Sequence, residues 1–80
     1  MTSTVDTTAA LGAAIRHRRI KRGMKFAVLA ELAEIGPTAL TAIEDGAMAP
    51  SDRQLANIAT ALASTPDALR RSAHNPAVTA

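Results

Sequence analysis

The chain has 80 residues, a formal net charge of +2 and a pI near 9.9, with one phenylalanine and no tyrosine, tryptophan or cysteine. A chain of this length forms one small domain that gains from dimerising, and the lack of cysteine excludes disulfides and thiolate metal sites. No lysine or arginine precedes the first short apolar run, so we expect neither a secretory signal nor a membrane span but a cytoplasmic protein.

No strand is predicted, because no run of β-branched or aromatic residues alternates with polar ones. The sequence instead predicts five short helices separated by Gly, Pro and Ser residues. The polar stretch 1–8 is expected to be a flexible N-terminal arm. The first helix is expected over about 9–22, with Thr8 as its N-cap and Gly23 as its end. The second is expected over about 26–33.

The third and fourth helices carry the clearest end signals. Pro37 fits the first position of the third helix, and Gly46 can close its other end in the left-handed conformation. Ser51, followed three residues later by Gln54, predicts a capping box at the start of the fourth helix. The sequence therefore predicts both ends of the third helix and the start of the fourth.

A short last helix is predicted where Thr65 can act as N-cap and Pro66 as first helical residue. The stretch 73–80 lacks periodicity and is expected to be a flexible C-terminal tail. The folded domain is thus expected over 9–72.

This order of elements resembles the helix-turn-helix domains of the phage-repressor and Cro family (the XRE type). The resemblance covers the chain from Leu11 to Leu69 without a gap, and it rests on LGAAIRHRRIKRG, LAEL, LTAIEDG, PS with LANIATAL, and PDAL. It implies an all-α, five-helix lambda-repressor-like domain. It also implies a DNA-binding transcription regulator or repressor, a homodimer that places the helix over 37–45 in the major groove of double-stranded DNA.

The resemblance further implies a structural ion pair between Arg19, late in the first helix, and Glu44, at the end of the third. Arg19 shares one face of the first helix with Leu11 and Ile15, and Glu44 follows the inward-facing Ile43, so the pair would fix one helix against the other. Breaking one partner of a buried pair typically costs about 3–5 kcal/mol because the other charge is stranded.

The turn before the third helix departs from the family pattern. Glu34 stands where the family usually has glycine, and a non-glycine residue in the left-handed conformation costs about 1–2 kcal/mol. Gly36 followed by Pro37 offers another end, for a longer second helix. The family register is favoured because four later residues fall in place, namely Leu40, Ile43, Glu44 and Gly46.

The family's DNA contacts, carried over by position, are weak here. The base-facing candidates are Pro37, Thr38, Thr41 and Ala42, and the phosphate-binding candidates are Lys25, Arg16, Arg18 and Arg53. Hydroxyls can bond a base edge and methyls can touch thymine, but none of these residues makes the bidentate contact that dominates direct readout. Six of the nine Lys and Arg lie between residues 16 and 25, which favours sequence-independent phosphate binding. Asp45 and Asp52 would oppose it.

The alternative is a helix-turn-helix fold adapted as a protein–protein interaction module, an antitoxin-like or phage/host adaptor with weak or no specific DNA binding. The segment MKFAVLAELAEI is more apolar than a helix with one buried face requires. The candidates for a protein-contact patch are Met24, Phe26, Val28 and Met48. Equally, Met24 and Phe26 can fold back onto the core.

An enzyme is not expected. His17 and His74 are far apart in the sequence and have no paired carboxylates spaced for acid–base chemistry. Separated histidines do not make a metal site, and no glycine-rich loop suggests a nucleotide. We therefore expect no catalytic residue, no metal and no cofactor.

Overall fold

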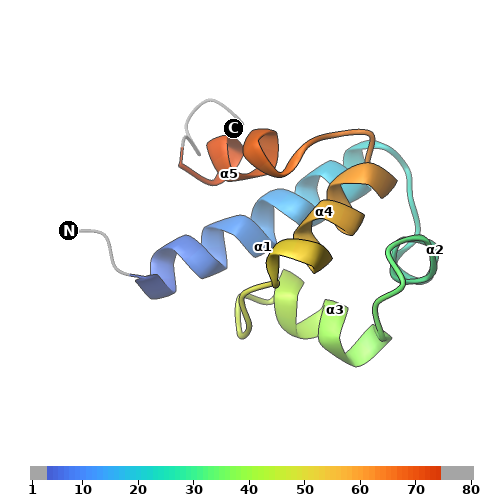
Figure 1. Cartoon of the computed structure of the whole chain (residues 1–80), viewed down its shortest axis with the longest axis horizontal. Coiled ribbons are helices and arrows are strands. Elements are labelled where there is room, and N and C mark those ends of the chain that lie inside the picture. The colour runs from blue at the N-terminus through green and yellow to red at the C-terminus, as the bar shows by residue number, and fades with distance from the viewer. Residues whose placement is uncertain (1–3, 75–80) are drawn as a thin grey trace.

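The computed structural model describes the backbone of residues 4–74, which forms five α-helices and, within that range, no strand (Figure 1). The helices are α1 (Thr4–Lys21), α2 (Phe26–Leu32), α3 (Pro37–Glu44), α4 (Asp52–Ala61) and α5 (Pro66–His74). Their number and order are those predicted from the sequence.

The first helix is longer than predicted. It begins at Thr4 instead of at about residue 9, so Thr8 lies inside α1 and is not its N-cap. The segment TVDTTAA contains no Gly or Pro that would end a helix, so the helix continues through it. The rest of the predicted arm, residues 1–3, and most of the predicted tail, residues 75–80, lie outside the described residues.

The predicted end signals at the other helices are confirmed. The Ser51 backbone N–H donates to Gln54 Oε1 (2.9 Å), and the Gln54 backbone N–H donates to Ser51 Oγ (3.1 Å), which completes the capping box. Thr65 Oγ1 accepts a hydrogen bond from the backbone N–H three residues later. Gly46, with φ +80°, follows α3 as expected. Local sequence therefore fixes where these helices start and stop.

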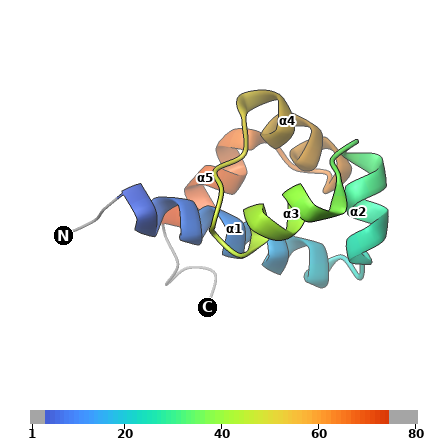
Figure 2. The ribbon, with the colours of Figure 1, turned by 90° about the horizontal axis from the view of Figure 1, so that it is seen from below.

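Aliphatic side chains from all five helices form the core. The fully buried large side chains are Ile15, Leu29, Leu40, Ile43, Leu55, Ile58 and Leu62, and Leu69 of α5 joins them. Helix α1 packs against α5 and against α3. Figure 2 shows α3 beside α1, and α2 next to the start of α3. Through this packing, α1 holds α3 in place.

The turn between α2 and α3 has the family register and not the alternative one. Helix α2 ends at Leu32, and Glu34 adopts the left-handed conformation with φ +58°. Gly36 has φ −61° and precedes α3, so it does not end a longer α2. The Asn57 side-chain amide of α4 donates to the carbonyl oxygen of Ala33 (3.2 Å), which ties the turn to the domain.

No single helix in the described part of the chain has both the length and the apolar character needed to cross a membrane. Helices α2 and α3 reach that length and composition only together, and they are bent by 112° at the turn between them.

Candidate nucleic-acid interface

A bidentate ion pair anchors the inner side of α3 to α1, as predicted. Arg19 Nε donates to Glu44 Oε2 (2.8 Å) and Arg19 Nη2 donates to Glu44 Oε1 (3.0 Å). Only 13 % of the Arg19 side chain and 5 % of the Glu44 side chain are exposed. The hydrogen bonds that Arg19 donates to the Glu44 carboxylate raise the pKa of Arg19 above its ordinary value, although burial acts in the opposite direction. This geometry is the strongest that an arginine and a carboxylate form.

The Phe26 ring covers this ion pair. The guanidinium carbon of Arg19 lies 5.7 Å from the ring centroid, within the range of a cation–π contact. Phe26 and Met24 pack against the core, whereas Val28 and Met48 are 41 % and 37 % exposed. Val28 is two residues from Phe26 and so lies on the opposite side of α2. The four candidates for a protein-contact patch therefore do not share one surface.

Gly12 brings α1 close to the end of α3, and sequence analysis missed its role. A Cβ atom at Gly12 would overlap the carbonyl oxygen of Ile43 and lie 2.9 Å from that of Glu44. A Cβ atom at Gly46 would similarly lie 2.7 Å from Cα of Ala9. An isolated glycine inside an otherwise helical pattern was the available signal at Gly12. Both glycines allow the backbones of the two segments to meet.

The outer face of α3 carries the predicted base-facing residues. Pro37, Thr38 and Thr41 are exposed and Ala42 is half-buried. The helix turns its other side, with Leu40 among the buried residues, to the core. The exposed set thus combines methyl groups with two hydroxyls.

The start of α3 has no side-chain cap. Gly36 occupies the N-cap position and supplies no side-chain hydrogen bond, whereas Ser51 caps α4 and Thr65 caps α5. The first backbone N–H groups of a helix have no partner within the helix. At α3 these donors point along the axis toward water or a ligand that accepts hydrogen bonds.

Three of the four phosphate-binding candidates are exposed, namely Lys25, Arg16 and Arg53. Lys25 occupies the N-cap position of α2. A hollow of about 290 Å³ is lined by Phe26 of α2 and Pro37 of α3, so the start of α2 adjoins the start of α3. Arg16 lies one helical turn before Arg19 and therefore on the flank of α1 that faces α3.

Arg18, the fourth phosphate-binding candidate, lies at the end of α4 and not near α3. Its Nε donates to the carbonyl oxygen of Leu62 (3.4 Å) and its Nη2 to that of Ala63 (3.3 Å). Leu62 is the C-cap of α4 and Ala63 follows it, so these carbonyls lie at the C-terminal end of the helix, where a cation is favoured. Arg18 thus lies on the flank of α1 away from α3, apart from the other three candidates.

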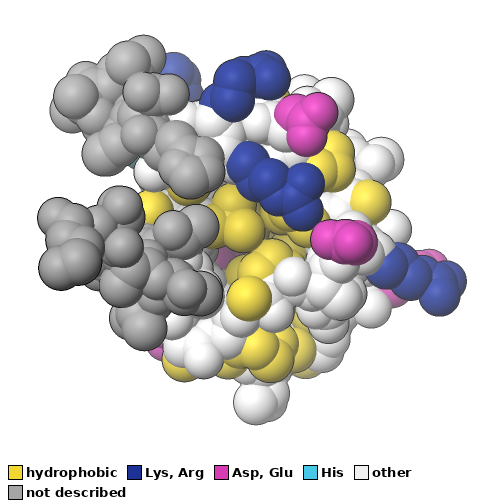
Figure 3. Space-filling view, turned by 60° about the vertical axis from the view of Figure 1, so that its left-hand side comes forward, with side chains coloured by type: hydrophobic (Ala, Val, Ile, Leu, Met, Phe, Trp, Pro, Cys, Tyr) yellow, Lys and Arg dark blue, Asp and Glu magenta, His cyan; other side chains and the backbone are white. Residues whose placement is uncertain are grey.

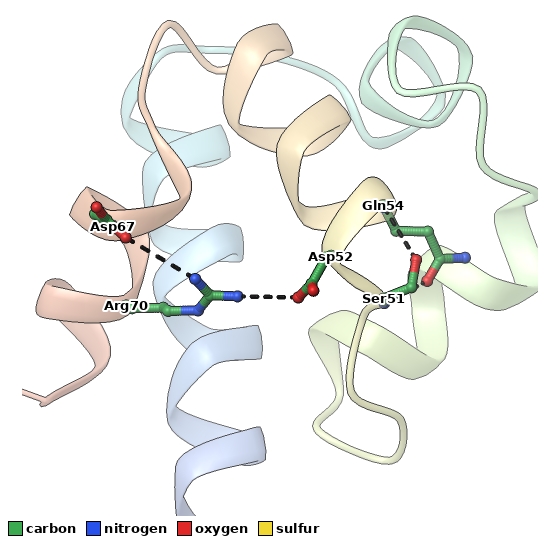
Figure 4. A network of polar contacts seen from close by, with 5 residues as sticks. All are labelled: Ser51, Asp52, Gln54, Asp67 and Arg70. Carbon is green, nitrogen blue, oxygen red and sulfur yellow. Dashed lines mark hydrogen bonds and ion pairs between the residues drawn. The ribbon is translucent and has the colours of Figure 1, made fainter.

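Acidic side chains also lie near α3. Asp45 is exposed four residues after Thr41, on the same side of the helix. Arg70 approaches both Asp52 (3.4 Å) and Asp67 (3.9 Å), as Figure 4 shows. Figure 3 shows Lys or Arg side chains next to Asp or Glu side chains on the face that it displays. The negative charge of Asp52 is partly offset in this way, whereas Asp45 would repel a phosphate.

A model of the helix-turn-helix domain family matches residues 10–73 of the chain. The crystal structure of the clp gene regulator ClgR from Corynebacterium glutamicum is similar, with 29% identity and a TM-score of 0.84 over 91% of this chain and 78% of that one. A second crystal structure of ClgR gives 30% identity and a TM-score of 0.82 over 88% and 91%.

The restriction-modification controller protein C.AhdI from Aeromonas hydrophila is also similar, with 26% identity and a TM-score of 0.74 over 78% of this chain and 94% of that one. No curated protein sequence matches the chain. The predicted fold class is confirmed by these structures, and the matched residues include α2, the turn and α3.

Proposed function

Because the chain belongs to the helix-turn-helix domain family, we propose that it is a DNA-binding transcription regulator of the phage-repressor type. It acts as a homodimer and places α3 in the major groove of double-stranded DNA. One observation carries this proposal: Arg19 and Glu44 fix the inner side of α3, while Thr38 and Thr41 remain exposed on its outer side. The similar structures are those of a gene regulator and a restriction-modification controller.

The base contacts of this regulator are few. The hydroxyls of Thr38 and Thr41 bond base edges or phosphate oxygens, and the methyl group of Ala42 touches a thymine methyl. Pro37 positions the first turn and donates no hydrogen bond. Such a helix discriminates modestly between bases, so the spacing of two half-sites in the dimer supplies much of the selectivity.

Phosphate contacts supply most of the affinity. Lys25 contacts the backbone from the start of α2, Arg16 from α1 and Arg53 from α4, while the uncapped N–H groups at the start of α3 donate hydrogen bonds to a phosphate. Arg18 is left out of this set because carbonyl oxygens of α4 hold its guanidinium.

The test is fluorescence anisotropy with genomic DNA fragments across a salt series, with light scattering on the free protein. The parent chain is expected to prefer some fragments over competitor DNA at moderate salt. Lys25→Gln should weaken binding to all sequences and reduce the salt slope by about one, as the loss of one phosphate contact does. Lys21→Gln, which removes a charge from the last turn of α1 on the flank away from α3, is the matched control and should leave the slope unchanged. No preference for any fragment would overturn the regulator proposal.

The second candidate is a protein-interaction module, antitoxin-like or a phage/host adaptor. It is favoured by exposed apolar side chains, since Ile20 is 58 % and Leu32 57 % exposed. Val28 and Leu32 are four residues apart and share one side of α2. A pull-down that recovers a stable hetero-complex with the parent chain, but not with a Val28→Ser, Leu32→Ser variant, would favour this function over DNA binding.

A further inference from the structure

A groove of about 520 Å³ runs between α1 and α5, on the flank of α1 opposite to the one that holds α3. This volume is in the range of small-molecule sites. Its floor is formed by methyl groups, among them Ala10 and Ala14 of α1 and Leu69 and Ala73 of α5. Neither Gly12 nor Arg19, which meet α3, lines it. The groove is therefore separate from the proposed DNA interface.

Among the described residues that line the groove, the basic ones lie at one end, and Ser72 is a polar residue at the other end. Helix α5 runs back along α1 (Figure 1), so Ser64 lies beside the C-terminal half of α1 and Ala73 beside its N-terminal half. His17, Arg18 and Lys21 line the first end, and no acidic residue is among the described residues that line the groove. Lys21 is eleven positions after Ala10, which corresponds to about 16.5 Å of helix.

Arg18 is already oriented at the basic end. Its Nε and one N–H of Nη2 donate to the carbonyl oxygens of Leu62 and Ala63. A guanidinium has five N–H donors, so three remain for another acceptor. The Arg18 side chain is therefore already in position for a ligand carboxylate, and Lys21 lines the same end of the groove. Because Arg18 is ordered before the ligand binds, less conformational entropy is lost on binding.

We propose that this groove binds a small organic anion with an apolar body, in its simplest form a medium-chain carboxylate. The carboxylate accepts hydrogen bonds from Arg18, Lys21 and Ser64, and the alkyl chain covers the alanine floor. The charge of the lining argues against a second copy of the chain as the occupant. A two-fold contact places the same surface on both sides, so it would bring basic side chains together without an acidic partner.

The experiment is an NMR titration of the 80-residue chain with decanoate below its micelle concentration. Decanoate is expected to bind once per chain and to shift amide signals of α1 and α5 that line the groove. Octanoate should bind about tenfold more weakly, because two methylene groups are lost. Decylammonium, with the same chain and the opposite charge, should bind at least about tenfold more weakly than decanoate, which is the effect of losing one charge-assisted contact.

Variants test the two ends of the groove. Lys21→Gln should weaken decanoate binding about tenfold, and Arg22→Gln, a neighbouring charge that does not line the groove, should leave it unchanged. Ala14→Leu fills the floor and should abolish binding. Ala68→Leu serves the same purpose if the first variant fails to fold by circular dichroism.

The proposal is overturned by equal binding of decylammonium, by signal shifts centred on α3, or by decanoate binding that Lys21→Gln and the filling variants leave intact. It is also overturned if decanoate does not bind and light scattering shows a dimer that Ala14→Leu dissociates. DNA is absent from every arm, so failure here is independent of the proposed regulator function.

Discussion

Removal of the Arg19 side chain tests how strongly α1 fixes α3. Arg19→Ala leaves the Glu44 carboxylate 5 % exposed and without the two hydrogen bonds of 2.8 and 3.0 Å that now neutralise it. It also removes the hydrogen bond to the carbonyl oxygen of Met24 (3.2 Å) and the contact with the Phe26 ring. A stranded buried charge costs about 3–5 kcal/mol. A domain of this size has a total stability of about 5–15 kcal/mol, so the loss should be a large part of it.

The assay is urea unfolding followed by circular dichroism, with Arg16→Ala as the control from the same helix. Arg16 is exposed, and its removal should change the free energy of unfolding by no more than about 0.5 kcal/mol. The double variant Arg19→Met, Glu44→Leu should recover most of the loss, because no charge is then left buried. Equal effects of Arg19→Ala and Arg16→Ala would refute the reasoning, and so would a double variant that is no more stable than Arg19→Ala.

The pH dependence of the same pair has a definite sign. The pKa of Arg19 is raised in the folded state, so its contribution to stability is fully present below the unfolded pKa and is lost only as the pH rises through the folded one. That window is strongly alkaline. The stability difference between the parent chain and Arg19→Ala should therefore stay constant from neutral pH to about pH 10, and a steady decline over that range would contradict it.

Other substitutions test the turn, the helix contact and the interface. Gly12→Ala should lower the free energy of unfolding by about 1–3 kcal/mol, because the added Cβ atom would overlap the backbone at the end of α3. A melting temperature equal to that of the parent chain would contradict this close approach. Glu34→Gly relieves about 1–2 kcal/mol of left-handed strain and costs about 0.5–1 kcal/mol because glycine has more backbone freedom in the unfolded chain. The free energy of unfolding in urea should therefore rise by about 0–1.5 kcal/mol, and a fall would argue against strain at φ +58°. Replacing Thr38 and Thr41 together by Ala should reduce the preference among DNA fragments with no change in melting temperature, and an unchanged preference would exclude them from base contacts.

Helix boundaries could be predicted wherever a local signal acts. The Ser51 capping box and the glycine after α3 need only neighbouring residues, so the sequence is sufficient for them. The start of α1 could not be placed in this way, since nothing in its first residues ends a helix. Gly12 escaped notice because its importance depends on a contact with residues 43 and 44, and only the packed structure brings them together.

The candidate site was predictable to a similar extent. Thr38 and Thr41 were assigned correctly to the exposed face of α3, because helical periodicity decides which side Leu40 takes into the core. Arg16 and Arg18 belong to one basic run, yet they lie on opposite flanks of α1 because two positions along a helix correspond to a rotation of about 200°. Which flank faces α3 depends on how α1 packs against α5, and this long-range contact cannot be inferred from charge patterning.

The inner and outer sides of α3 differ in the number of directional contacts that they make or offer. On the inner side, a buried ion pair, the Phe26 ring and the close approach at Gly12 fix the position of the helix. On the outer side, hydroxyls and methyl groups offer few directional contacts, and the negative charge of Asp45 lies beside them. A rigid helix with a small outer surface can enter a groove closely even where it reads few bases. Under the proposed DNA-binding function, the selectivity of the protein should depend on groove shape and half-site spacing more than on any single side chain of α3.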